Sequence, residues 1–438
     1  MTFDKYLHYL VVSMVNVRKT KKLILSYDNL LLLFFAVVYF IDAKGLSFIL
    51  VNAKLTLSAL EMIALVAVFF VALMLISKRG RNFLKEESYL SMYMVVVILI
   101  AVIISIYSIR KYDENIVDVY VCSMPFFLFF MTPLLTYLMR KDPASMRKVL
   151  RMLVVIGVAT SVMILIQGLC SDFGIPYVLP GTFRIGYRNG RIRVGVTNIG
   201  RFGTIFMLYK FIVGGKKRLF YGLFAALGVF VLIYYGQTRM DIISLVACIV
   251  AMLFFAGSKK PVYRVLLVVA FLVFIFYDYA DVILGSFSEK SEKGASTVAR
   301  LGAIDYFYSV FKEDPLMGMG FIRPRNAYLR RIWTGPRGVF YFSDLGALGH
   351  LMQYGIIGVA LYILPFARMI YIAIQLLRQR RSESVWAMGV IAYILVSQIS
   401  LNYTEYQRGP GSVAYWAVME SLYKGEEYGF SREKAPKT

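Results

Sequence analysis

The sequence predicts an all-α polytopic membrane protein. Hydrophobic residues make up 59% of its 438 residues and charged residues only 17%, whereas soluble domains carry about 25% charged residues. Many apolar runs approach the roughly 20 residues that cross a hydrocarbon core as a helix. The composition therefore favours a bundle of membrane-spanning helices over a soluble core.

Apolar runs of this length predict about twelve spans, with boundaries good to about four residues. No internal repeat or soluble domain interrupts the pattern, so we expect residues 1–438 to form a single membrane domain. The predicted spans lie near 26–42, 57–77, 89–109, 117–139, 149–170, 197–214, 219–235, 241–257, 264–281, 344–366, 385–401 and 412–423.

The basic residues orient these spans. With both termini in the cytoplasm, the inside segments hold 16 Lys and 13 Arg, and the outside segments hold 6 Lys and 14 Arg. Cytoplasmic loops of membrane proteins are enriched in Lys and Arg, which favours this orientation. The formal net charge of +23 follows mainly from it, and we expect no nucleic-acid partner.

Two outer loops are long, one near 171–196 and a larger one near 282–343, between the ninth and tenth spans. A loop as long as the second is usually functional. Its first half predicts an amphipathic helix near 296–312 on the outer surface, ended by Asp314-Pro315. The apolar positions recur at intervals of three and four residues: Val298, Leu301, Ile304, Tyr308 and Phe311.

Each outer loop contains a segment whose basic residues are all arginine and which has no acidic residue. The first runs from Gly181 to Arg201 and the second from Phe321 to Ser343, with five arginines in each. A planar guanidinium binds phosphate through two parallel hydrogen bonds, which a lysine cannot do. We expect these arginines to bind a phosphate-bearing ligand. The alternative is that they anchor at lipid headgroups or pair with nearby carboxylates.

Candidate general bases lie at the outer ends of the last spans. Asp344 precedes the tenth span, where it could act on a substrate or cap the helix. His350 follows six residues later, about 120° around the helix from Asp344. It is therefore either a base or a buried, hydrogen-bonded histidine. Glu405, in the last outer loop, is the third candidate, with Arg408 as its expected ion-pair partner.

Arg239 lies at a very short outer turn that opens the eighth span. An arginine that faces inward at such a position is often functional, and pairing with Asp241 is the alternative. The sequence contains neither GxxxxGK[ST] nor HExxH. We therefore expect no nucleotide-driven pump, no metal and no cofactor. The spans are also poor in acidic residues, which disfavours an ion-coupled transporter.

The order of four segments resembles the Wzy-type family of O-antigen, capsule and exopolysaccharide polymerases, within the O-antigen polymerase–ligase superfamily. The resemblance covers roughly 190–365 and includes the large outer loop. The segments are Arg193-x-Gly195-x-x-Asn198, Gln237-Thr-Arg239, Ala299-Arg300 through Pro315-Leu-Met-Gly318-Met-Gly320, and Asp344-x-Gly-x-Leu-Gly through Gly355-Ile-Ile-Gly358.

The resemblance implies a glycosyltransferase of the bacterial cytoplasmic membrane that joins oligosaccharide repeat units carried on undecaprenyl pyrophosphate. A chain-length regulator and a flippase would be its partners. The expected catalytic residues are Asp344, His350, Arg239 and Glu405, and the expected substrate-binding residues are Arg193, Arg201, Arg300, Arg323, Arg325, Arg330 and Arg408.

One departure bears on the choice within this superfamily. O-antigen ligases typically carry a His-Asn pair eleven residues before the Gly-Ile-Ile-Gly element, and here that position holds Asp344-Leu345. This favours a polymerase, with a ligase as the alternative. A flippase of lipid-linked oligosaccharides is the alternative from a different class. It would need charge within the spans, whereas these arginines cluster in outer loops.

Overall fold

A computed structural model describes residues 27–43, 53–175, 185–188, 191–214, 217–256, 292–336, 338–399 and 409–424. The ninth predicted span, Glu405 and Arg408 lie outside these residues. Nearly all of the described chain is helical, and a helix lies at every predicted span position within it. Five of these helices are long and apolar enough to cross a membrane, or six if the bent pair α3–α4 counts as one span. The all-α multi-pass class is thus confirmed, while the number and orientation of the spans stay predictions.

The chain begins with eight helices and the elements that connect them. They are α2 (Tyr27–Asp42), α3 (Ala53–Ile76), α4 (Lys78–Glu86), α5 (Ser88–Tyr112), α6 (Ile116–Phe127), the 3₁₀ turn η2 (Leu128–Phe130), α7 (Met131–Arg140), α8 (Pro143–Asp172) and α9 (Asn198–Val213). An antiparallel hairpin, β1 (Ile185–Arg188) and β2 (Arg191–Val194), precedes α9.

The remaining elements complete the bundle and cover one of its ends. They are α10 (Arg218–Phe230), the π-helical turn η3 (Val231–Gly236), α11 (Arg239–Phe255), α13 (Glu292–Glu313), α14 (Ala327–Thr334), the 3₁₀ turn η5 (Phe342–Asp344), α15 (Gly346–Arg378), α16 (Glu383–Ser397) and α17 (Gly409–Tyr423).

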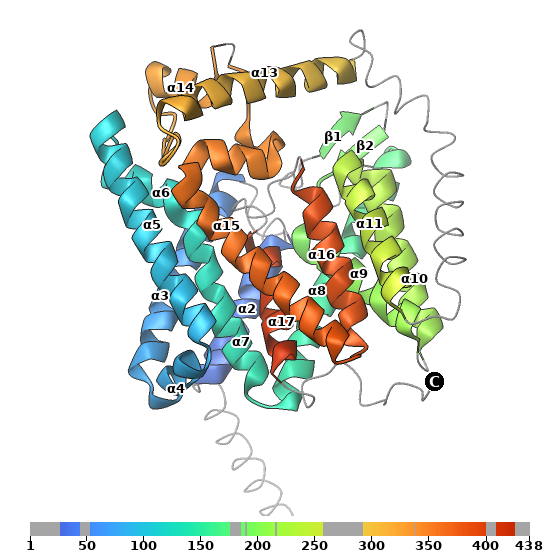
Figure 1. The fold of residues 1–438 in the computed structure, drawn as a ribbon. Coiled ribbons are helices and arrows are strands. Elements are labelled where there is room, and N and C mark those ends of the chain that lie inside the picture. Colours follow the sequence, from blue (N-terminus) through green and yellow to red (C-terminus); the bar gives the residue numbers. More distant parts are fainter. Residues whose placement is uncertain are drawn as a thin grey trace, which may run out of the picture.

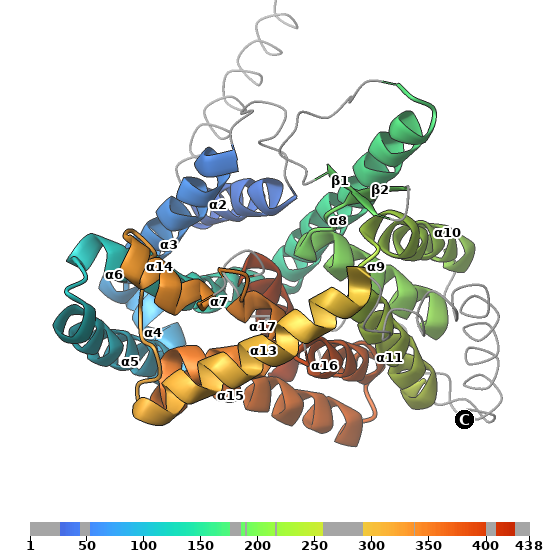
Figure 2. The ribbon, with the colours of Figure 1, turned by 90° about the horizontal axis from the view of Figure 1, so that it is seen from above.

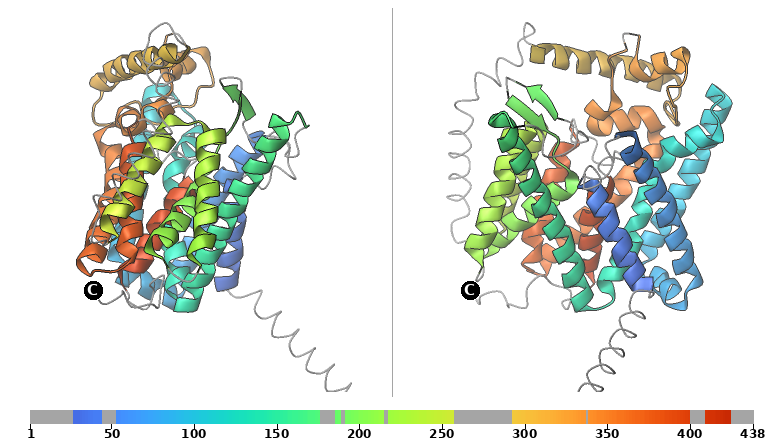
Figure 3. Two further views of the ribbon diagram at one scale, coloured as in Figure 1. Left: turned by 90° about the vertical axis from the view of Figure 1, so that its right-hand side faces the viewer. Right: turned by 180° about the vertical axis from the view of Figure 1, so that it is seen from behind.

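The bundle has two distinct ends (Figure 1). The α13 end carries α13, α14 and the hairpin, and the α4 end carries α4 and the start of α8. Seen from above, α13 runs across the bundle over α15 and α16 (Figure 2). Two further views show α13 and the hairpin at the same end (Figure 3). The described parts of both arginine-rich segments therefore lie toward the α13 end.

α13 spans the stretch where the sequence predicts a surface helix, but a different face of it packs on the protein. Ala303 and Phe307 are buried, and the Phe307 ring stacks on Phe342 with 3.8 Å between centroids. The apolar positions Val298 and Leu301, which carried the prediction, are 51% and 58% exposed. Of the predicted apolar stripe, Val298, Leu301 and Tyr308 are thus exposed, whereas Ile304 and Phe311 are partly buried against the protein.

The tenth predicted span differs from the expected continuous helix. It begins after η5, at Gly346, and α15 breaks at Gly355, where φ is 67° and ψ is −174°. A side chain at Gly355 would place its Cβ 2.2 Å from the Leu316 carbonyl oxygen. Gly355 therefore permits a left-handed turn against another backbone segment.

The segment Pro315–Gly320 fills this break with backbone hydrogen bonds. The amides of Met319 and Gly320 donate to the carbonyls of Met352 and Gln353 at 3.1 and 2.7 Å. In return, the amides of Ile356 and Ile357 donate to the carbonyls of Pro315 and Leu316, at 3.0 and 3.2 Å. Buried backbone groups need such partners, so the segment supplies what the interrupted helix lacks.

A buried ionic network holds the α4 end together. Glu420 is fully buried and accepts two hydrogen bonds from the Arg368 guanidinium, at 2.8 and 3.0 Å. Arg140 pairs with the buried Glu87, which also pairs with Lys424 at 2.7 Å. Removing one member of such a network would leave a buried charge without its partner. The network thus joins α5, α7, α15 and α17 far from the arginine-rich segments.

Candidate functional site

Arg193 joins the hairpin to the start of α11. Its Nε donates to the Gly236 carbonyl at 3.3 Å, and its Nη2 donates to the Thr238 hydroxyl at 3.2 Å. The Gln237 amide nitrogen donates back to the Ile192 carbonyl at 3.0 Å. Both partners of Arg193 are neutral, and no carboxylate in the described part of the chain lies within ion-pair distance. Within the described residues, its positive charge is therefore fixed in place without being neutralised.

The start of α11 adds to this positive potential. Gln237 adopts a left-handed conformation with φ of 49°, and α11 begins at Arg239. The Thr238 hydroxyl contacts Arg193 and Gly236 and does not cap the helix. A helix N-terminus carries a partial positive charge and free amide groups, which suit an anion. The structure describes the backbone of Arg239 and not its side chain.

Arg201, which the sequence assigns to substrate binding, lies in a buried ion pair. Its guanidinium donates to the Asp241 carboxylate and to the Asn198 side-chain oxygen, both at 2.6 Å. The Tyr393 hydroxyl donates to the other oxygen of Asp241 at 3.1 Å. Asp241, expected as the alternative partner of Arg239, thus pairs with Arg201. This pair connects α9, α11 and α16 inside the bundle.

Two arginines of the second segment have an acidic partner from elsewhere in the chain. Arg323 donates to the buried Asp118 carboxylate at 2.7 Å, and Arg325 pairs with its other oxygen. The backbone amide of Arg323 donates to Glu114 at 2.8 Å. Burial raises the pKa of Glu114 above its ordinary value. The lack of acids within the segment therefore does not leave Arg323 and Arg325 unpaired.

The other predicted arginines at this end are exposed. Arg330 lies on α14 and Arg300 on α13, and both side chains are exposed. Among the described residues, neither guanidinium has a hydrogen bond or an ion pair. Arg323 and Arg325, in contrast, both pair with Asp118. The charges of Arg300 and Arg330 are available to a ligand that approaches the α13 end.

Of the predicted bases, two are described. Asp344 ends the turn η5 and is partly buried. His350 is 4% exposed, its Nδ1 is hydrogen-bonded to the Tyr362 hydroxyl, and its ring stacks on Tyr354 with 5.7 Å between centroids. His350 thus has the features of a buried, hydrogen-bonded histidine, which was the alternative to a catalytic base. The described residues contain no group of three or more His, Cys, Asp or Glu that could hold a metal ion.

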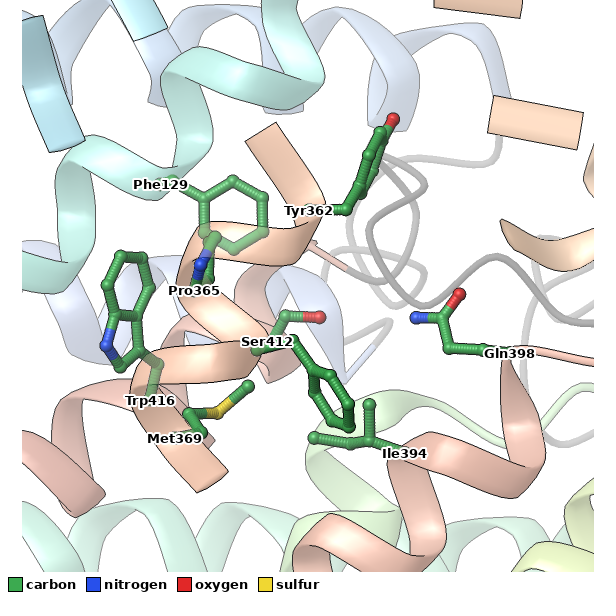
Figure 4. Close-up of a pocket in the computed structure, with 9 residues that line it drawn as sticks. Phe129, Tyr362, Pro365, Met369, Ile394, Gln398, Ser412 and Trp416 are labelled. Atoms are coloured by element: carbon green, nitrogen blue, oxygen red, sulfur yellow. The ribbon is translucent and has the colours of Figure 1, made fainter. Parts of the chain in front are cut away.

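Tyr362 also lines a pocket between α15, α16, α17 and η2 (Figure 4). Gln398 and Ser412 provide further polar groups, while Phe129, Pro365 and Met369 are among the apolar lining residues. Sequence reasoning missed Tyr362 and Gln398, because neither belongs to a charged pattern. It also missed Asp118. An acidic residue just inside a predicted span, four positions after Glu114, could have indicated a partner for an arginine.

The four segments that carry the family resemblance form two contacting pairs. The segment Arg193–Asn198 contacts Gly236–Thr238 through the hydrogen bonds of Arg193. The segment Pro315–Gly320 contacts the break at Gly355 through backbone hydrogen bonds. Each pair thus unites stretches that are separated in the sequence, and both pairs lie toward the α13 end.

Comparison with known proteins supports this family. The model of the family described as O-antigen ligase matches residues 202–363, which include Arg239, α13, α14 and the break at Gly355. A search of curated proteins found no match. Residues 202–363 are therefore similar to the O-antigen ligase family, which confirms the resemblance to the O-antigen polymerase–ligase superfamily.

Proposed function

We propose that this protein is a polysaccharide polymerase of the bacterial cytoplasmic membrane. It joins oligosaccharide repeat units that are carried on undecaprenyl pyrophosphate, at the outer face. The family match supports a glycosyltransferase-like enzyme of the O-antigen ligase and polymerase type. A chain-length regulator and a flippase would act with it.

The observation that carries this proposal is the position of Arg193. Two neutral groups, the Gly236 carbonyl and the Thr238 hydroxyl, fix its guanidinium beside the N-terminus of α11. A fixed, uncompensated positive charge next to free helix amides is suited to an anionic ligand. We assign pyrophosphate binding to Arg193 and Arg239, and contacts to the lipid-linked chain to the exposed Arg300 and Arg330.

The chemistry of the transfer needs such a site. When the bond between the anomeric carbon and the phosphate oxygen breaks, negative charge builds up on the departing pyrophosphate. Preorganised cations stabilise that charge without reorganising during the reaction. Arg323 and Arg325 already face the carboxylate of Asp118, so we assign them the role of holding the second segment on α6.

The second candidate function is polysaccharide ligation, which uses the same donor with a different acceptor. The description of the matched family, O-antigen ligase, favours it. The sequence feature against it is Asp344-Leu345, at the position where ligases of this superfamily typically carry His-Asn. Both functions require the same arginines for the leaving group. The two functions are therefore distinguished by the glycans that accumulate when the protein is absent.

The test is to delete the protein in its native host and to size the glycans that remain on the lipid carrier. Loss of a polymerase leaves single repeat units, loss of a ligase leaves long polymer on the carrier, and loss of a flippase traps repeat units inside. The variants Arg193→Lys and Arg239→Lys should lose polymer at normal membrane levels. Arg147→Lys, at an exposed site at the α4 end, is the matched control. Full polymer in both variants would contradict the arginine assignment.

A further inference from the structure

A short helix lies across the end of the bundle that is far from the proposed transferase site. α3 ends at Ile76, and α4 leaves it at an angle of 99°. The Ser77 hydroxyl caps α4 by accepting a hydrogen bond from the Gly80 amide at 3.0 Å. A Cβ at Gly80 would lie 2.2 Å from the Met74 carbonyl oxygen, so the sharp bend needs a glycine there. Because α3 is predicted to cross the membrane, α4 is expected to lie along the membrane surface.

α4 has a buried face and a basic face. Gly80 and Leu84 are buried against the protein. Lys78, Arg81 and Lys85 are exposed and lie within about 60° of one another around the helix, roughly opposite the buried face. A helix with basic residues on one face and an apolar opposite face is typical of helices that lie at a membrane interface.

Arg81 is fixed at the corner between α3 and α4. Its Nη1 donates to the carbonyls of Leu75 and Ile76, at 3.3 and 2.8 Å. These carbonyls belong to the last turn of α3, where no further helical amide can satisfy them. The side chains of the same two residues are 50% and 72% exposed. The guanidinium thus lies where an apolar surface meets a basic one, which corresponds to the depth of lipid headgroups.

The basic face of α4 is not neutralised within the described part of the chain. α4 contains four basic residues and one acid, Glu86, and none of the four forms an ion pair with a described residue. For Arg81, no described residue contacts Nε or Nη2. One edge of its guanidinium is therefore free to make two parallel hydrogen bonds to a phosphate. Lys424, which donates to the Glu86 carbonyl at 2.8 Å, adds a further positive charge nearby.

We propose that α4 is a binding site for anionic phospholipid. Lys78, Arg81 and Lys85 bind the phosphate of a phosphatidylglycerol headgroup in the leaflet at the α4 end, and Leu75 and Ile76 contact its acyl chains. Such a lipid presents negative charge and apolar chains at adjacent depths, in the same order as α4 and α3 present their complements. The site is distinct from the proposed transferase site, and the proposal does not depend on that function.

The test uses the full-length protein in nanodiscs made from an equal mixture of phosphatidylcholine and phosphatidylglycerol. Native mass spectrometry counts the lipids of each class that stay bound. We expect the unmodified protein to retain phosphatidylglycerol in preference. Arg81→Gln should lower this preference about fivefold, equivalent to about 1 kcal/mol, and Arg81→Lys should lower it less. The combined variant Lys78→Gln, Arg81→Gln and Lys85→Gln should abolish it. Because the face is exposed, the preference should also fall as salt is added.

The matched control removes the same charge elsewhere at the same end of the bundle. Arg147→Gln, Lys148→Gln and Arg151→Gln change three exposed basic residues at the start of α8, and this combined variant should keep the preference. An equal loss in both combined variants would show that diffuse charge attracts the lipid, which would overturn the proposal. Absence of any preference in the unmodified protein, or a preference that survives all changes in α4, would overturn it as well.

A different occupant of the basic face has its own outcome. An acidic protein would copurify with the unmodified protein and with the α8 variant, and it would be lost from the α4 variant. If this happened while phosphatidylglycerol showed no preference for α4, the face would bind protein and the lipid proposal would be wrong. Melting temperatures in phosphatidylcholine alone check that each variant is folded, and Arg81→Lys retains the test if the combined α4 variant is not.

Discussion

The two arginine-rich segments each contain five arginines and no lysine or acid, yet the described arginines in them have different partners. In the first, Arg193 is held by a carbonyl and a hydroxyl, with no carboxylate partner among the described residues. In the second, Arg323 and Arg325 share the carboxylate of Asp118, a residue about 200 positions earlier. The comparison teaches that a segment without acids can still be neutralised by a distant part of the chain. The free charge belongs to the arginines with neutral partners or none.

Within the first segment there is a second contrast, between Arg193 and the buried Arg201. Removing the carboxylate with Asp241→Asn would leave the Arg201 charge buried without compensation. We expect a loss of stability of about 3–5 kcal/mol, measured as a lower melting temperature in detergent and as less protein in the membrane. The matched control is Asp305→Asn, at an exposed position on α13.

A double variant sharpens this contrast. Arg201→Met combined with Asp241→Leu replaces the ion pair by apolar side chains of similar size. Such replacements are often neutral or stabilising, so the double variant should be more stable than Asp241→Asn alone. If Asp241→Asn melted at the same temperature as Asp305→Asn, the account of Arg201 as a buried structural residue would be wrong.

In the second segment, Asp118→Asn should release Arg323 and Arg325 from α6. We expect a smaller loss of stability, about 1–2 kcal/mol, because the Asp118 carboxylate is buried whereas both guanidinium groups are partly solvated. The local effect is the more direct measurement: trypsin should cleave after Arg325 faster in Asp118→Asn than in the unmodified protein or in Asp305→Asn. An unchanged cleavage rate would show that Asp118 does not anchor the segment.

The smallest effect concerns Glu114, which accepts the Arg323 amide and lies between α5 and α6. Burial raises its pKa above the ordinary value of 4.5, so the folded protein binds this proton more readily than the unfolded chain. The group therefore stabilises the fold at low pH, and this contribution is lost as the pH rises through the raised pKa.

Glu114→Gln imitates the protonated carboxyl and keeps an oxygen for the Arg323 amide. We expect its melting temperature at pH 7 to equal or slightly exceed that of the unmodified protein. Its melting temperature should also depend less on pH between about 4.5 and 7. A clearly lower melting temperature at pH 7 would mean that ionised Glu114 stabilises the loop, contrary to this account.

The contrast between the segments also marks what the sequence could predict. The apolar runs predicted helices wherever the structure describes the predicted spans, because twenty consecutive apolar residues leave few other solutions. The helix α13 was visible as apolar residues at intervals of three to four, although only some of them pack on the protein. The helix break was not, because Gly355 has the same sequence signature as a glycine at a helix contact, and its hydrogen-bond partners lie in Pro315–Gly320.

The site was predictable in its residue types and not in its pairings. The choice of arginine over lysine pointed to the α13 end, and the order of the motifs pointed to the family. Which arginines keep their charge depends on Asp118 and Asp241, and these contacts arise from packing between helices distant in sequence. The partner of His350 was hidden for the same reason, since helical periodicity does not place Tyr362 beside it.

The most direct test of the central claim compares the two segments in one experiment. Arg193→Lys and Arg325→Lys are expressed in a deletion host, and polymer is measured per molecule of membrane protein. The account predicts that Arg193→Lys lowers polymer about a hundredfold at normal membrane levels, with single repeat units left on the lipid carrier. Arg325→Lys should retain polymer per molecule. Full-length polymer from Arg193→Lys, or an equal loss in both variants, would contradict it.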